Sequence, residues 1–449
     1  MTEYNHNATS PVLLKSAQVE GQLVDVLFSD VILDMGQLQP SAGVAVIDAR
    51  QCALLPGLTD HHLHVRAYAA LETSVDIGPA AVDGLPALRA LLASQPGQGW
   101  IRCVGYHEST LGELTQAELA GFARPIRIQH RSGKVWILND VALAELNIED
   151  SSEPGVERDS RGLATGRLFR MDAWLDRHLA RTTHNLQAVR DELARYGVTQ
   201  LTDASHTNIR ADETALKAVL SPLQVNCMGA DVNGNLKVML DEDRLPDFTQ
   251  LVQSIDQAHQ QDRGVAFHCV SRVESVFAVA ALREAGVSAA DRIEHGGMIP
   301  ATLIEELAGL GLPVITQPGF IYSRGDQYLA AIPAQELPDL YRYQSLLDGG
   351  VRVLASSDAP YGPLDPWRVM ASAVQRHSSS GQPIGAGERV SADEALSGYL
   401  RPTPRAERRR LAIGAEADMC LLDRSWQRAC EDLTAVCVQQ TWRGGVPLL

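Results

Sequence analysis

PGLTDHHLHV, residues 56–65, places three of the chain's thirteen histidines within four positions. The apolar stretch before them indicates a buried strand that ends where the histidines begin. His62 and His64 are two residues apart, so in an extended segment their side chains point to the same side and can hold one metal ion together. A single histidine at a strand end is commonly no more than a hydrogen-bonded polar group, so the rest of the chain has to decide between the two interpretations.

Short apolar strands alternate with helical stretches after this point. The strands include GVTQLTDA (197–204), GVAFHC (264–269) and VRVLASSD (351–358). Such alternation favours a parallel sheet, and eight strand candidates beginning at Leu58 favour closure into a TIM (β/α)8 barrel. The sequence SADE (391–394) is a capping box and predicts the start of a last helix.

Both ends of the chain are rich in short strands. We therefore expect an α/β protein whose residues 56–405 form the barrel, while residues 1–55 and 406–449 pair into a small β-sandwich. No repeat or long linker interrupts this order.

Composition excludes several classes of protein. The 449 residues are 45% hydrophobic and 21% charged, which is enough to bury a large core. The formal net charge of −16 disfavours a nucleic-acid partner. We predict no membrane association, because no apolar run approaches the roughly 18 residues of a membrane span. The polar start and the absence of a CxxC pair predict a cytoplasmic protein with reduced cysteines.

The carboxyl ends of the strands carry a coherent set of polar residues. His62 and His64 follow the first strand, and His268, His295 and Asp358 follow or end three later strands. A barrel collects its chemistry at this rim, so five independent coincidences would be needed if these residues were unrelated. Four histidines and a carboxylate suit zinc above all, with iron or manganese as alternatives.

These residues, in this order, resemble the amidohydrolase superfamily. The motifs are LLPGLTDHHLH, FHC, RIEH and SSDAP, and the likeness includes VIDA near the N-terminus and IGAEADMCLLD near the C-terminus. The residues around these motifs most resemble the amidohydrolase family 3 branch, which contains YtcJ-like proteins and N-substituted formamide deformylases. The resemblance implies a distorted TIM barrel, a small β-sandwich, and one or two divalent metals that activate water.

The resemblance also implies roles for individual residues. His62 and His64 would bind the more buried metal, His268 and His295 the more exposed one, and Asp358 would bind metal and handle the proton. His61 would point away. Two-metal members add a carboxylated lysine as a bridge, for which Lys237 in GNLKVMLDEDRLPD is the candidate. Lys134 stands where larger relatives show a histidine, and substrate contact is the role we expect for it.

The reaction expected of these parts is hydrolysis of an amide, N-acyl or cyclic amide bond of a small molecule by metal-activated water. Asp358, with His295, would carry the catalytic proton transfers. Deamination of an aminated heterocycle is the alternative, although Ser271 stands where deaminases of this superfamily commonly place a glutamate. A binding protein that keeps the fold without catalysis is a further alternative, but all five expected ligands are present. A homodimer is compatible with the resemblance.

Other polar residues near the predicted rim are candidates for substrate binding. Arg131 and Lys134, on either side of a glycine, could receive a substrate carboxylate. The full set is Tyr106, His107, Arg131, Lys134, Trp136, Gln317, Tyr322, Arg324 and Tyr361.

Overall fold

The computed structural model describes residues 10–79, 81–179 and 184–448. The chain divides into two compact units: one comprises the described residues up to Val65 together with those from Leu186 onward, and the other is Arg66–Asn185. The sequence had not indicated this second unit, because its short apolar strands look like those of the predicted barrel. The predicted domain boundaries at 55 and 405 stay a prediction.

Among the residues that the structure describes, the larger unit contains eight parallel strands. Three form one sheet in the order β14-β13-β6, and five form another in the order β15-β16-β17-β18-β19. The bounds are β6 Leu58–Leu63, β13 Val198–Asp203, β14 Gln224–Cys227, β15 Leu236–Met239, β16 Val265–Cys269, β17 Arg292–His295, β18 Val314–Thr316 and β19 Val353–Ala355. The α/β class is confirmed. In the described ranges the strands form two hydrogen-bonded sheets rather than one closed ladder, so barrel closure stays a prediction.

Two backbone hydrogen bonds tie the strand-end segments of the two sheets together. Asp358 N–H donates to the His62 carbonyl at 2.8 Å, and His64 N–H donates to the Ala359 carbonyl at 2.8 Å. The segment after β19 is thereby held beside the end of β6, although these strands belong to different sheets. The two bonds hold His62, His64 and Asp358, three of the residues that sequence analysis placed at one rim, next to one another.

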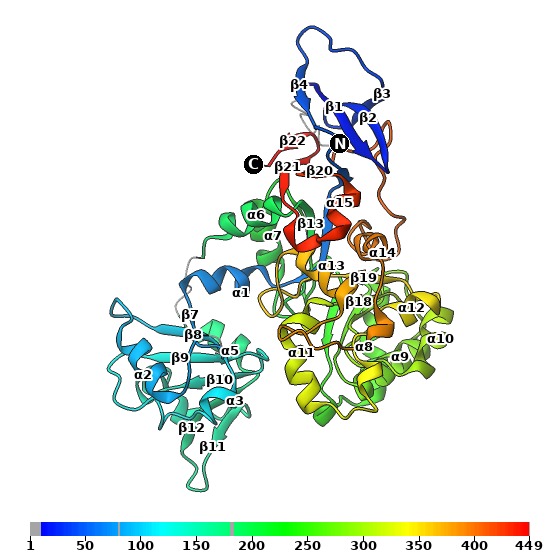
Figure 1. Ribbon diagram of the computed structural model, residues 1–449. Coiled ribbons are helices and arrows are strands. Elements are labelled where there is room, and N and C mark those ends of the chain that lie inside the picture. Colours follow the sequence, from blue (N-terminus) through cyan, green and yellow to red (C-terminus); the bar gives the residue numbers. More distant parts are fainter. Residues whose placement is uncertain (1–9, 80, 180–183, 449) are drawn as a thin grey trace. The chain divides into compact units, whose positions relative to one another are not determined.

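Helices follow most of these strands and pack on the outside of the sheets (Figure 1). Ser391 caps α14 with a complete capping box, as expected, but α14 is not the last helix as predicted, because α15 follows it. The helix bounds are α6 Leu186–Arg195, α7 Arg210–Val219, α8 Phe248–Gln260, α9 Arg272–Ala285, α10 Ala301–Leu310, α11 Gly319–Ala331, α12 Gln344–Asp348, α13 Pro366–Gln375, α14 Ala392–Ser397 and α15 Trp426–Glu431.

The chain ends form two four-stranded sheets within the same unit. Their orders are β3-β2-β1-β4 and β22-β21-β20-β5. Both contribute to one hydrophobic cluster, in which the Phe28 and Trp442 rings meet edge to face at 5.5 Å. The two ends therefore associate, whereas the sandwich architecture stays a prediction. The bounds are β1 Val12–Val19, β2 Gln22–Phe28, β3 Ile32–Gly36, β4 Ala45–Asp48, β5 Leu54–Pro56, β20 Met419–Leu422, β21 Val438–Arg443 and β22 Val446–Pro447.

The second unit is built on a six-stranded mixed sheet in the order β11-β12-β10-β9-β8-β7. The bounds of its strands are β7 Val75–Asp76, β8 Ile101–Tyr106, β9 Ile126–His130, β10 Val135–Leu138, β11 Val156–Arg158 and β12 Ala164–Phe169. The helices in this part of the chain are α1 Val65–Ala69, α2 Leu85–Ala93, α3 Glu108–Leu111, α4 Asp140–Glu145 and α5 Asp172–His178.

Candidate metal centre

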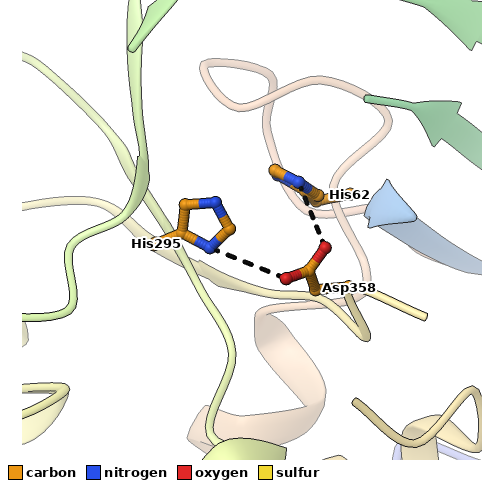
Figure 2. Close-up of side chains that lie close together, drawn as sticks. All are labelled: His62, His295 and Asp358. Carbon is orange, nitrogen blue, oxygen red and sulfur yellow. Dashed lines mark ion pairs between the residues drawn. The ribbon is translucent and has the colours of Figure 1, made fainter. Parts of the chain in front are cut away.

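The strand ends of the larger unit bring His62, His295 and Asp358 together. One ligand atom from each of these buried side chains lies within 4.8 Å of the other two. Figure 2 shows the Asp358 carboxylate between the two imidazoles. Its oxygens lie 3.5 Å from His62 Nε2 and 3.9 Å from His295 Nδ1. Two imidazoles and a carboxylate around one point form a ligand set that suits a divalent metal.

Two further predicted ligands lie beside this cluster. His64 Nε2 is 3.2 Å from Asp358 Oδ1, and the His64 ring centroid is 5.5 Å from that of His62. The His268 ring centroid is 4.5 Å from that of His295. Ser205 Oγ lies 3.0 Å from His64 Nδ1 and orients the ring. All four predicted histidines and the aspartate therefore share one site.

The backbone at two of these residues is strained. His295 has a φ of 67° and Asp358 a φ of 51°, in the left-handed region that side chains rarely occupy. Such residues cost about 1–3 kcal/mol each and persist where the surrounding structure holds them. Positive φ also occurs at nine other non-glycine residues of the described ranges, so the strain marks these two positions as held in place by their surroundings and does not by itself identify a functional site.

Lys237 lies on β15 and is buried with its amine near the cluster. Its Nζ has no hydrogen-bond partner among the described residues. Burial lowers the pKa of Lys237, and Glu294 opposes this effect. A buried amine without a partner and with a lowered pKa fits a lysine that reacts with carbon dioxide, because only the neutral amine is nucleophilic. The donor set and this orphaned amine thus fit the metal site that the sequence predicted.

Burial also shapes the protonation of the ligands. Burial and the nearby Lys237 hold the pKa of His62 well below its usual range, and burial lowers the pKa of His295 to about 4. Burial alone would raise the pKa of Asp358, but the nearby His64, whose Nε2 lies 3.2 Å from Oδ1, lowers it below its usual value. At neutral pH the cluster therefore offers neutral imidazoles and a carboxylate, the forms that bind metals.

Sequence analysis missed two buried charged residues of β17, Arg292 and Glu294. Glu294 contacts Nδ1 of His62, and Arg292 contacts Glu294 through its Nε. A charged pair at two-residue spacing within a buried strand is the signal that could have identified them. His61 is buried, with its Nε2 unpartnered among the described residues, and its expected orientation away from the metal stays a prediction.

The predicted substrate residues of the larger unit surround the cluster to different degrees. Gln317 Oε1 lies 2.8 Å from His295 Nδ1, so it orients that ring. The Tyr361 ring centroid is 5.5 Å from that of His64. Arg324 stacks on Phe320 and donates to the Tyr361 carbonyl at 3.0 Å, while Tyr322 is exposed. Their roles toward a substrate stay predictions.

The other five predicted substrate residues belong to the second unit. The Tyr106 hydroxyl donates to the Gly112 carbonyl, and His107 caps α3. Trp136 is buried, with Nε1 donating to Asp172 at 2.9 Å. Arg131 donates its backbone N–H to the Tyr106 carbonyl, and Lys134 is exposed. Their contact with a substrate stays a prediction.

Comparison with known proteins assigns the family. The model described as "Amidohydrolase family" matches residues 45–449. The chain belongs to the amidohydrolase family. The amidohydrolase is therefore a hydrolase that acts on carbon–nitrogen bonds, and the family implies a divalent metal, for which the His62–His295–Asp358 cluster is the candidate site.

Individual relatives agree with this assignment. The amidohydrolase is 24% identical to the N-substituted formamide deformylase of Arthrobacter pascens, over 84% of this chain and 85% of that protein. It is 26% identical to the putative amidohydrolase YtcJ of Bacillus subtilis (strain 168), over 29% of this chain and 26% of that protein. An uncharacterized metal-dependent hydrolase from Pyrococcus horikoshii OT3 has a similar fold, with a TM-score of 0.73 at 18% identity over 92% of this chain and 98% of that one. None of the helices in the described ranges is long and apolar enough to cross a membrane.

Proposed function

We propose that this amidohydrolase hydrolyses an N-acyl or formamide-type amide bond of a small molecule, with a divalent metal, most simply zinc, held by His62, His295 and Asp358. The observation that carries the proposal is the convergence of these three buried side chains within 4.8 Å. We propose that His64 and His268, whose rings lie next to those of His62 and His295, complete the ligand set. The likeness to a formamide deformylase along most of both chains supports this substrate class.

A divalent cation bound at this cluster would activate water and polarise the substrate carbonyl. Asp358 is the residue that we propose to transfer the proton. Its carboxylate lies within the ligand cluster and stays ionised at neutral pH, so it can accept a proton from the attacking water. The same group, once protonated, can deliver that proton to the departing nitrogen as the carbon–nitrogen bond breaks. Oxygen from water remains on the carbonyl carbon, and a carboxylic acid and an amine leave.

Lys237 is proposed to bridge two metals as a carbamate. Its unpartnered amine is buried within the electrostatic reach of Asp358 and Glu294. The neutral amine, which is the form that reacts with carbon dioxide, is more abundant here than at the surface, because burial disfavours the ammonium form. A single-metal enzyme would leave this lysine as an amine.

The structure gives no support to deamination as the preferred reaction. Ser271, three residues beyond His268, caps α9: its Oγ accepts the N–H of Glu274, and the Glu274 carboxylate accepts the N–H of Ser271. The residue at this position is therefore committed to the helix start and has no carboxylate to protonate a ring nitrogen.

A substrate panel tests the proposal. Purified protein loaded with zinc, iron or manganese would be incubated with N-substituted formamides, N-acyl amines, cyclic amides and aminated heterocycles, while released amine, carboxylate and ammonia are measured. We expect amine release from formamides or N-acyl amines, and loss of that activity when metal is removed by a chelator. Release of ammonia from heterocycles without amide cleavage would refute the proposed reaction.

A further inference from the structure

The buried carboxylate of Glu294 contacts a predicted metal ligand that comes from the other parallel sheet. Glu294 Oε2 meets Nδ1 of His62, and both side chains are almost fully buried. Glu294 lies on β17 of the five-stranded sheet, whereas His62 lies on β6 of the three-stranded sheet. The contact therefore spans two sheets and does not follow from hydrogen bonding between neighbouring strands.

Arg292 braces this carboxylate. It lies two residues before Glu294 on the same strand, so both side chains project to the same side of β17. Its Nε contacts Oε1 of Glu294, and its Nη2 donates to the His61 carbonyl at 2.8 Å. The guanidinium of Arg292 thus neutralises the Glu294 carboxylate and is itself hydrogen-bonded to the backbone next to His62. A buried charge needs such a partner to be tolerated.

We infer that Glu294, braced by Arg292, is a positioning residue that keeps the proton of the His62 imidazole on Nδ1 and presents Nε2 to the metal. The inference rests on the proposed metal site. A neutral imidazole has one N–H, and the carboxylate can only accept, so the proton lies on the nitrogen that faces Glu294. His62 Nε2 then turns its lone pair toward Asp358, whose Oδ1 lies 3.5 Å away. Carboxylate partners of this kind orient metal-binding histidines and strengthen their binding.

The Glu294→Gln substitution tests this geometry with almost no change in shape. Arg292 has only donors, so the new amide must turn its oxygen toward Arg292 and its NH2 group toward His62. His62 Nδ1 would then have to accept, and its proton would move to Nε2, which could no longer bind the metal. We expect the metal dissociation constant of E294Q, measured by competition with a chromophoric chelator, to rise by roughly 10–100-fold.

Asp291→Asn is the matched control. Asp291 is a fully buried carboxylate three residues before Glu294. It pairs with His259 Nε2 at 3.0 Å and accepts the backbone N–H groups of Val265 and Ser288, none of which is a predicted metal ligand. D291N removes a buried charge beside a histidine just as E294Q does, but it leaves His62 untouched. We expect D291N to lower thermal stability and to keep the metal dissociation constant of the wild type.

A measurement on the metal-free wild-type protein tests the inference even if the variants fail to fold. Nitrogen-15 correlation spectra distinguish the two imidazole tautomers, and the inference requires His62 to be protonated on Nδ1. Protonation on Nε2 would overturn it, as would an unchanged metal dissociation constant in folded E294Q or an equal loss in D291N. If wild-type protein itself binds no metal at the cluster, the proposed function fails; if wild type binds and E294Q binds equally well, only this inference fails.

Discussion

Asp358→Asn is the substitution that separates catalysis from folding at this site. Asparagine has nearly the same size and tolerates the left-handed φ of 51° that this position adopts, so the backbone is expected to stay in place. What changes is the charge. The carboxylate has imidazole nitrogens at 3.2, 3.5 and 3.9 Å, and the amide can neither accept a proton from water nor neutralise a cation.

The size of the effect follows from the proton transfers that Asp358 is proposed to perform. General acid–base groups contribute typically 10²–10⁴-fold. Loss of both transfers, together with a metal ligand, is expected to lower kcat/KM about 10³-fold, which is about 4 kcal/mol of transition-state stabilisation. The measurement is steady-state amine release from the best substrate of the panel, with metal content determined on the same sample.

A neighbouring aspartate provides the control. Asp365 caps α13 by accepting the N–H of Trp367 at 2.9 Å, and asparagine is an equally good cap. Asp365→Asn is therefore expected to keep wild-type activity. The reasoning would be refuted if metal-loaded D358N retained near-wild-type kcat/KM, or if D365N lost activity to the same extent.

Two further predictions concern protonation and the lysine. In metal-free protein, unfolding should require less free energy as the pH falls from 6.5 toward 4, because the unfolded chain protonates His61, His62 and His295 while burial holds their folded-state pKa values lower, at about 3 for His61 and about 4 for His295. Burial raises the pKa of Asp60 to about 6, so the folded protein takes up one proton there and opposes this trend. The two protons left over give the free energy of unfolding a slope of up to about 2.7 kcal/mol per pH unit below pH 6. Urea unfolding at several pH values measures this slope, and a flat profile would contradict the prediction. Lys237→Arg keeps a cation but cannot form a carbamate, so we expect metal analysis to find at most one ion per chain; an unchanged count of two would rule out the bridge.

The residues at the strand ends could be predicted because each strand and the polar residue that ends it are neighbours in the sequence. An apolar strand followed by a histidine or an aspartate is visible in the chain, as in VAFHC and VLASSD, and parallel strands bring such ends to one edge. His62, His64, His268, His295 and Asp358 are therefore found in one site. The predicted capping box at Ser391 is likewise a short-range pattern, and it is confirmed.

The features that the sequence did not predict depend on contacts between distant segments. Glu294 stands beside His295 in the chain, but its partner His62 is 232 residues away and on another sheet. The six-stranded sheet of the second unit is built from strands with the same apolar character as the barrel candidates, so composition alone could not separate them. Tyr106 and Trp136 illustrate the same limit: their polar atoms are engaged within that unit, a fact that no local pattern reveals.

Anomalous diffraction from crystals of the metal-loaded protein tests the central claim most directly. The account predicts a metal peak bound by His62, His295 and Asp358, at distances of about 2.0–2.2 Å from their ligand atoms. A second peak next to Lys237 would add the carbamate bridge. A saturated protein whose metal lies elsewhere, with these three side chains unliganded, would contradict the account.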